Sequence, residues 1–238
     1  MSARTPQWIV ALGIGLVLSP LLSLTPLLQY IGWFLASLFH ECGHCVIALF
    51  TGHSAIPAIR LDGHAAAIHG PQSKLLVWAT WALLGYGVFW FRERLAIACG
   101  FAGLTLVYPA LVFTGFGEVA HLAAGHLGEL AFASYAMWCA STGGFTQGMA
   151  ERVAYALLGF WLFGRNAVLF FGLFADASAR AHYEGNGSFG MQNDLIRIAD
   201  QCSMSLQTIG MFFLAITIVT AIVSIGVSAT HAHGTARP

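Results

Sequence analysis

Residues 27–51 read LLQYIGWFLASLFHECGHCVIALFT, an apolar run that carries the polar sequence HECGH at positions 40–44. A stretch of about 20 apolar residues is long enough to cross the hydrocarbon core of a bilayer as a helix. The bilayer interior penalises His and Glu side chains, so three of them in one run need a compensating role. We therefore interpret this run as a membrane-spanning helix that carries a functional site.

The HECGH sequence fits the H-E-x-x-H pattern of zinc hydrolases. Residues four apart share one face of a helix, so the imidazoles of His40 and His44 can bind the same Zn²⁺. Glu41 lies one step round the helix, where it can act on a water molecule without binding the metal. A catalytic zinc takes three protein ligands and keeps one open position. The pattern predicts two ligands and one acid–base residue, and a third ligand must come from elsewhere in the chain.

The composition is typical of a multi-pass membrane protein. Of the 238 residues, 58% are hydrophobic and only 8% are charged, whereas soluble domains carry roughly 25% charged residues. The formal net charge is zero, and without a basic patch to neutralise phosphates we exclude nucleic acid as a partner. The expected partners are the lipid bilayer and a membrane protein or peptide substrate, and the oligomeric state is left open.

Hydropathy along the chain predicts an all-α, polytopic transmembrane helical bundle of about six to seven spans. The apolar runs of spanning length cover residues 8–23, 27–51, 75–91, 95–114, 119–141, 153–174 and 206–228. The first two could form one unit broken at Pro26. A short strand-like segment at residues 56–61 follows the motif helix. We expect one integral membrane domain over residues 1–230 and a short polar tail at 231–238.

Residues 38–52, LFHECGHCVIALFTG, resemble the opening helix of the site-2-protease-like intramembrane zinc metallopeptidases. The glycine at the fourth motif position, the small and aliphatic residues after it and the Thr-Gly exit all fit that family. AGHLG at 124–128 looks like its Gly-rich third-region motif, although the family usually has Tyr where His126 stands. Arg165-Asn166, Asp176 and Asn193-Asp194-Leu195 resemble the closing portion of its short bacterial branch.

The resemblance covers roughly residues 27–228, and it departs from the family pattern near the C-terminus as well as at His126. The Asn-Pro-x-Pro-x-x-Asp-Gly signature is not found near the C-terminus, and Asp62-Gly63 repeats only its last letters, close behind the motif helix. The resemblance implies an intramembrane zinc metalloprotease of the bacterial inner membrane. It also implies that an aspartate before the last span, Asp194, is the third zinc ligand.

Three acidic residues compete for the place of that third ligand. Asp194 begins a segment with helical spacing, and its alternative role is to cap that helix. Glu129 lies within a predicted span, where a buried carboxylate needs a partner. That partner could be the metal, His126 or a neighbouring helix. Asp62 is the third alternative.

Two other functions remain open at the level of sequence. The chain could be a non-catalytic membrane scaffold with a structural zinc, although such a site has no use for Glu41. It could also be a membrane di-iron oxygenase, since Glu118-x-x-His121 has the spacing found in carboxylate-bridged metal pairs. That class needs further histidine boxes, which the sequence lacks. The histidines of the polar loops, His53, His64, His69 and His182, are expected to be solvated or to lie at the membrane interface.

Overall fold

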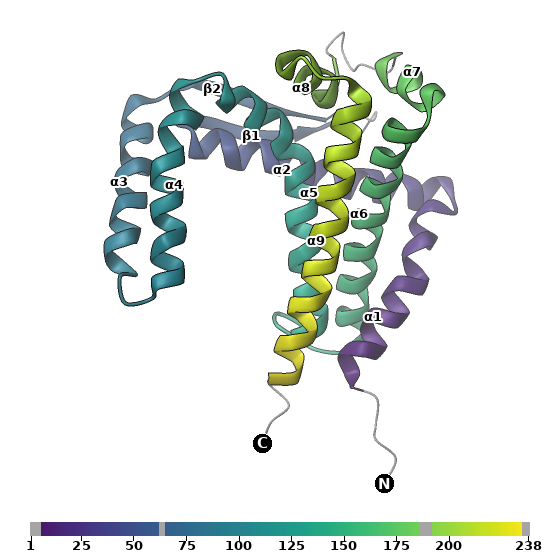
Figure 1. The fold of residues 1–238 in the computed structure, drawn as a ribbon. Helices are drawn as coiled ribbons and strands as arrows, with labels where there is room; N and C mark the ends of the chain where they lie inside the picture. The colour runs from purple at the N-terminus through teal and green to yellow at the C-terminus, as the bar shows by residue number, and fades with distance from the viewer. Residues whose placement is uncertain (1–5, 62–64, 186–191, 235–238) are drawn as a thin grey trace. The chain divides into compact units, whose positions relative to one another are not determined.

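The computed structural model describes residues 6–61, 65–185 and 192–234, which are mostly helical with one small two-stranded sheet (Figure 1). The chain divides into two compact units: Met1–Phe39 with His126–Pro238, and His40–Gly125. We call these unit 1 and unit 2. The helical class and the short strand after the motif helix are confirmed, whereas the single domain of residues 1–230 stays a prediction.

Every predicted apolar run contains a helix. The helices are α1 (Gln7–Leu18) with the 3-10 helix η1 (Ser19–Ser23), α2 (Pro26–Phe50), α3 (Lys74–Trp90), α4 (Leu95–Phe113), α5 (Phe116–Thr142), α6 (Met149–Ala175) and α9 (Leu206–Gly234). Two short helices, α7 (Ala177–Gly185) and α8 (Asp194–Cys202), connect α6 with α9. Helix α9 continues to Gly234, into the segment expected to be a tail.

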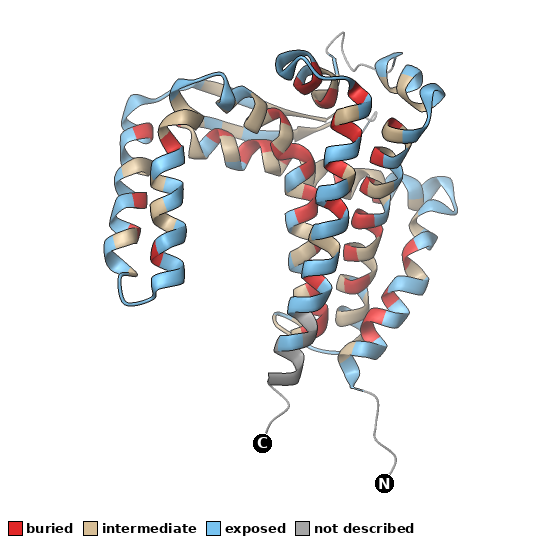
Figure 2. Cartoon of the chain, in the orientation of Figure 1, coloured by how far each residue is buried: buried red, intermediate tan, exposed pale blue. Residues whose placement is uncertain are grey.

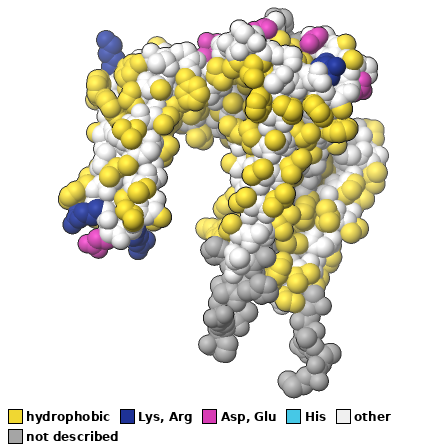
Figure 3. Space-filling model, viewed as in Figure 1, with side chains coloured by type: hydrophobic (Ala, Val, Ile, Leu, Met, Phe, Trp, Pro, Cys, Tyr) yellow, Lys and Arg dark blue, Asp and Glu magenta, His cyan; other side chains and the backbone are white. Residues whose placement is uncertain are grey.

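Four helices in the described part of the chain are long and apolar enough to cross a membrane, namely α2, α4, α6 and the Leu206–Val227 part of α9. These helices expose large apolar side chains on their outer surfaces, for example Leu106 of α4 (80% exposed) and Val168 of α6 (75% exposed). Such a surface is expected where the surroundings are lipid. Figure 3 shows hydrophobic side chains over the visible helices and charged ones at the turn between α3 and α4. Residues 92–94 of that turn are Arg-Glu-Arg.

Local signals set both ends of the motif helix α2. Thr25 accepts a hydrogen bond from the backbone N–H of Leu28 (3.3 Å), and Pro26 follows it as the first helical residue, where a missing N–H costs nothing. Beyond the other end, Gly52 adopts φ +92°, a conformation that favours glycine. An added Cβ there would also overlap Val77 of α3. This turn directs the chain from the motif helix into strand β1.

Unit 1 is a bundle in which α6 packs against both α1 and α9. Its core takes small and large apolar residues from several helices, for example Ala36 of α2, Ala133 and Met137 of α5, and Leu162 of α6, all fully buried. Figure 2 shows the buried positions on the inner faces of these helices. The core therefore surrounds the part of α5 that follows residue 125.

Unit 2 consists of a β-hairpin and a helical hairpin attached to parts of α2 and α5. Strands β1 (His53–Ile59) and β2 (Ala65–Gln72) pair antiparallel. Helices α3 and α4 pack on each other around the buried Tyr108, whose hydroxyl donates to the carbonyl of Val77 (3.1 Å). Strand β1 confirms the predicted strand-like segment. Strand β2 was not predicted.

Candidate metal centre

The motif helix brings His40 and His44 together, as their spacing predicts. Their ring centroids lie 4.8 Å apart, with an interplanar angle of 74°. His44 is 6% exposed and Glu41 is 7% exposed. Buried polar side chains cost free energy unless hydrogen bonds or an ion satisfy them. The three polar residues of the motif therefore form a compact, largely buried cluster on one helix.

The orientation of His44 is fixed from helix α5. Its Nδ1 lies 2.8 Å from the backbone carbonyl oxygen of His121, and a carbonyl can only accept, so Nδ1 carries the proton. In the neutral ring the lone pair is then on Nε2. Metal-binding histidines commonly donate their other ring N–H in this way, which fixes both the tautomer and the ring orientation. The ring of His44 is thus held with its lone pair on Nε2, the nitrogen that a metal would use.

Helix α5 also packs closely on His40. At Gly125, any Cβ would overlap the imidazole ring of His40, which is the nearest side chain. Only glycine permits this approach. Gly125 of the Ala124–Gly128 sequence therefore has a structural role, because it lets α5 pack directly on the first predicted ligand.

Two more imidazoles continue from His44 towards the β-hairpin. The ring of His121 lies 5.0 Å from that of His44, and the ring of His69 lies 4.6 Å from that of His121. Burial lowers the pKa of His69, and the nearby His44 and His53 lower it further. The expectation that His69 lies in a loop is wrong. It lies on strand β2, where it is exposed and beside His121.

Asp194 lies in unit 1, where it is the first residue of α8 and half-buried. The N-cap residue is Asn193, whose side-chain amide donates to the carbonyl of Tyr183 (2.8 Å) rather than capping the helix. Burial raises the pKa of Tyr183, and the negative charge of Asp194 raises it further. Asp194 is therefore not the capping residue, and its role as a ligand stays a prediction.

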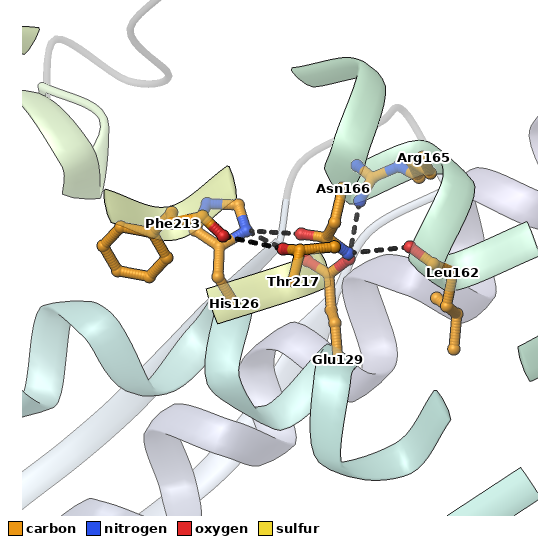
Figure 4. A network of polar contacts seen from close by, with 7 residues as sticks. All are labelled: His126, Glu129, Leu162, Arg165, Asn166, Phe213 and Thr217. Atoms are coloured by element: carbon orange, nitrogen blue, oxygen red, sulfur yellow. Dashed lines mark hydrogen bonds and ion pairs between the residues drawn. The ribbon is translucent and has the colours of Figure 1, made fainter. Parts of the chain in front are cut away.

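Glu129 has protein partners in unit 1, as Figure 4 shows. Its side chain is 1% exposed, and Oε2 accepts from Nη1 of Arg165 (2.8 Å) and Nδ2 of Asn166 (2.9 Å). The amide of Asn166 also donates to the carbonyl of Leu162 (3.0 Å). The ion pair with Arg165 supplies the partner that a buried carboxylate needs, so no metal is required to explain Glu129.

The same network sets the tautomer of His126. Nδ2 of Asn166 donates to Glu129 and to the carbonyl of Leu162. The Oδ1 atom of Asn166 therefore points to the other side, where it lies 3.2 Å from Nδ1 of His126. Nδ1 of His126 also lies 3.5 Å from Oε1 of Glu129. Both neighbours are acceptors, so Nδ1 carries the proton. His126 is therefore a member of a buried polar network, which was one of the alternatives for this part of α5.

Arg165 links that network to a cavity of about 460 Å³ in unit 1. The cavity is lined by η1, by the start of α2, including Gln29 and Trp33, and by part of α6. The Arg165 side chain is 35% exposed, pairs with Glu129 and also lines the cavity. No local pattern predicts that Arg165 and Glu129 pair, because they are 36 residues apart on different helices.

Among the described residues, His, Glu and Asp side chains form groups that could hold a metal ion. Imidazole and carboxylate together suit zinc, and imidazole also suits iron, copper and nickel. Asp62, the remaining alternative for the third ligand, lies outside the described residues, as does His64.

The chain matches no protein-family model, no curated protein and no solved structure. Its function is therefore argued from the residues and geometry of the site.

Proposed function

We propose that the chain is an intramembrane zinc metalloprotease that hydrolyses peptide bonds in membrane-embedded or membrane-adjacent segments. The observation that carries the proposal is the buried cluster on α2. His40 and His44 face one another there, His44 is oriented by a backbone carbonyl, and Glu41 lies beside them. The apolar helices support a multi-pass location in a membrane, which we propose is the bacterial inner membrane.

For the third ligand we propose Asp194 rather than Glu129. Arg165 and Asn166 already bind Oε2 of Glu129, and a metal would have to compete with this ion pair. Asp194 has a half-buried carboxylate at the start of α8 and is not the cap of that helix. His40, His44 and Asp194 would then leave one position open for water, as in catalytic zinc sites.

In this proposal the chain's own residues position water and move the proton. A bound zinc ion lowers the pKa of a water molecule towards neutrality and polarises the peptide carbonyl. Glu41 accepts the proton of the attacking water and then donates it to the departing amine. Its low exposure limits competing solvent, and a positioned acid–base residue of this kind contributes about 10²–10⁴-fold to the rate.

The substrate must present an extended backbone, because a peptide carbonyl in a helix is already hydrogen-bonded. The two-stranded sheet in unit 2 leaves one edge of each strand unpaired within the sheet. We propose that an unwound substrate segment adds to the β1 edge as a further strand. A proline at Ile59 should then reduce cleavage while leaving the metal content unchanged.

The test is to purify the full chain and its Glu41→Gln variant and to measure metal content and peptide cleavage. Both proteins should contain about one zinc, and in vesicles the native chain should cleave single-span membrane peptides, with products read by mass spectrometry. The Glu41→Gln variant should be at least about 10²-fold slower. Cys42→Ala, on the same turn, is the matched control and should remain active.

Each other outcome points to a different function. Two irons per chain would favour the di-iron oxygenase. Zinc retention with no cleavage by the native chain, or equal cleavage by Glu41→Gln, would favour a scaffold with structural zinc. A metal-free native protein would overturn the proposal.

A further inference from the structure

Helix α6 carries an arginine on the face that lines the cavity of about 460 Å³ in unit 1. The residues of this face recur at i, i+3, i+4 and i+7, the spacing of one side of a helix: Trp161, Gly164, Arg165 and Val168. The volume lies within the range of small-molecule sites, roughly 300–1,000 Å³. Helix α6 is also apolar enough to cross a membrane, and a charged residue within such a helix marks a candidate functional site.

The cavity continues along η1 and the start of α2, where its lining is again mostly apolar. Leu22 of η1 and Trp33 of α2 line it, together with Phe160 of α6. Gln29 also lines it, and its Nε2 donates to the carbonyl of Ser23 (2.7 Å), which ties α2 to the end of η1. Apolar walls with a small number of polar groups are the usual make-up of a ligand site.

Arg165 supplies the charge of this site. Among the described residues that line the cavity, it is the charged one. Its Nη1 donates to Oε2 of Glu129 (2.8 Å), as Figure 4 shows, but a guanidinium has five N–H donors. The N–H groups that Glu129 does not take can donate to a ligand, and the side chain is partly exposed. The planar guanidinium matches a pair of oxygens on a phosphate or a carboxylate.

We propose that this cavity binds one phospholipid molecule. The phosphate oxygens of the lipid accept hydrogen bonds from Arg165, and part of an acyl chain lies along the apolar walls, including Trp33. Gly164 is exposed and Val168 is 75% exposed, so the cavity is open on the surface of α6, where a spanning helix meets lipid. A phospholipid joins the anionic group that suits a guanidinium to the apolar chain that suits these walls, whereas a free phosphate has nothing to contact them.

Gly164 allows the cavity to be filled without changing the ion pair. A Cβ added at Gly164 meets nothing within 4 Å, and leucine is a better helix former than glycine. Gly164→Leu should therefore keep α6 intact and Arg165 paired with Glu129, while its side chain takes the space that the acyl chain needs. Gly103→Leu on α4 is the matched control, because a Cβ added there also meets nothing within 4 Å and Gly103 does not line the cavity.

The experiment adds phosphatidylglycerol, diacylglycerol, oleate or inorganic phosphate to the detergent-purified full chain and counts the retained molecules by native mass spectrometry. The native chain should retain one phosphatidylglycerol and bind diacylglycerol, which lacks the phosphate, at least about 10-fold more weakly. Gly164→Leu should weaken phosphatidylglycerol by at least about 10-fold, the effect of keeping about two methylene groups out of the cavity. Arg165→Gln should bring phosphatidylglycerol close to the affinity of diacylglycerol, and Gly103→Leu should behave as the native chain.

The result is independent of the proposed protease, because none of these variants changes the motif on α2. Equal retention of phosphatidylglycerol by Gly164→Leu and the native chain would overturn the inference, and so would equal affinities of the native chain for phosphatidylglycerol and diacylglycerol. Tighter binding of oleate, or displacement of the lipid by millimolar inorganic phosphate, would assign the cavity to a different anion and also overturn it. Circular dichroism and thermal unfolding of each variant check that the fold is retained.

Discussion

Helix α5 contributes to two buried polar clusters that differ in how their charges are satisfied. In unit 1, Glu129 is paired with Arg165 and Asn166, and His126 donates within the same network. The negative charge of Glu129 is therefore neutralised by the positive charge of Arg165. In unit 2, His44 is oriented by a neutral backbone carbonyl, and its ring faces those of His40 and His121.

The difference teaches how to separate a structural network from a candidate site. An ion pair that satisfies a buried carboxylate explains its presence through folding alone. The tautomer does not separate the clusters, because His44 and His126 both carry the proton on Nδ1, so the ion pair is the feature that marks the structural network. The resemblance already favoured Asp194 over Glu129 as the third ligand, and the ion pair of Glu129 with Arg165 gives a separate reason to keep that order.

The largest effect is expected when the zinc affinities of Asp194→Ala and Glu129→Gln are compared. Loss of a direct ligand should lower zinc affinity by more than the 10- to 100-fold typical of residues that only orient a ligand. Glu129→Gln should bind zinc with nearly native affinity. Competition with a chromophoric chelator measures both. The reverse ranking would make Glu129 the ligand and break the distinction between the two clusters.

The structural role of the unit 1 cluster should appear as a loss of stability. Glu129→Gln leaves Arg165 without its counter-charge, and we expect a cost of about 1–3 kcal/mol. The partial exposure of the Arg165 side chain keeps this below the cost of a fully buried pair. Thermal unfolding in detergent measures it. A double-mutant cycle with Arg165→Gln should show coupling between the two residues, and additive effects would contradict the ion pair.

Gly125→Ala should affect the metal centre more than the fold. The added Cβ overlaps the His40 ring, so the imidazole must turn away, and we expect roughly a 10-fold loss of zinc affinity, the lower end of what misplacing a ligand costs. Gly103→Ala on α4, where an added Cβ meets nothing within 4 Å, is the control. Isothermal titration calorimetry distinguishes the two variants, and equal zinc affinities would show that His40 is not held by this contact.

The smallest effect is expected at the turn that ends α2. Gly52→Ala places a side chain at φ +92° and against Val77, which should cost about 1–2 kcal/mol of stability. Zinc affinity should be unchanged, because the motif lies more than a turn earlier on the helix. Thermal unfolding at fixed zinc concentration measures the cost. A loss of zinc binding would mean that the turn also positions the motif.

The sequence predicted the helices well because each apolar run has one clear periodic or length signal. It also predicted the pairing of His40 with His44, since an i, i+4 spacing decides it without long-range contacts. The amphipathic start at Asp194 similarly predicted α8. It did not predict the helix α7, the strand β2 or the position of His69 beside His121, because short polar segments carry weak local patterns.

The sequence by itself determined an apolar, mostly helical chain with a helix that carries two facing histidines and a glutamate. Only the tertiary structure decided that Arg165 binds Glu129, that a carbonyl of α5 orients His44, and that Gly125 packs on His40. The physical reason is the distance along the chain over which each kind of interaction acts. Helical periodicity and length act between neighbours in the chain, whereas the partner of a buried polar group is chosen among residues that only folding brings within hydrogen-bond distance.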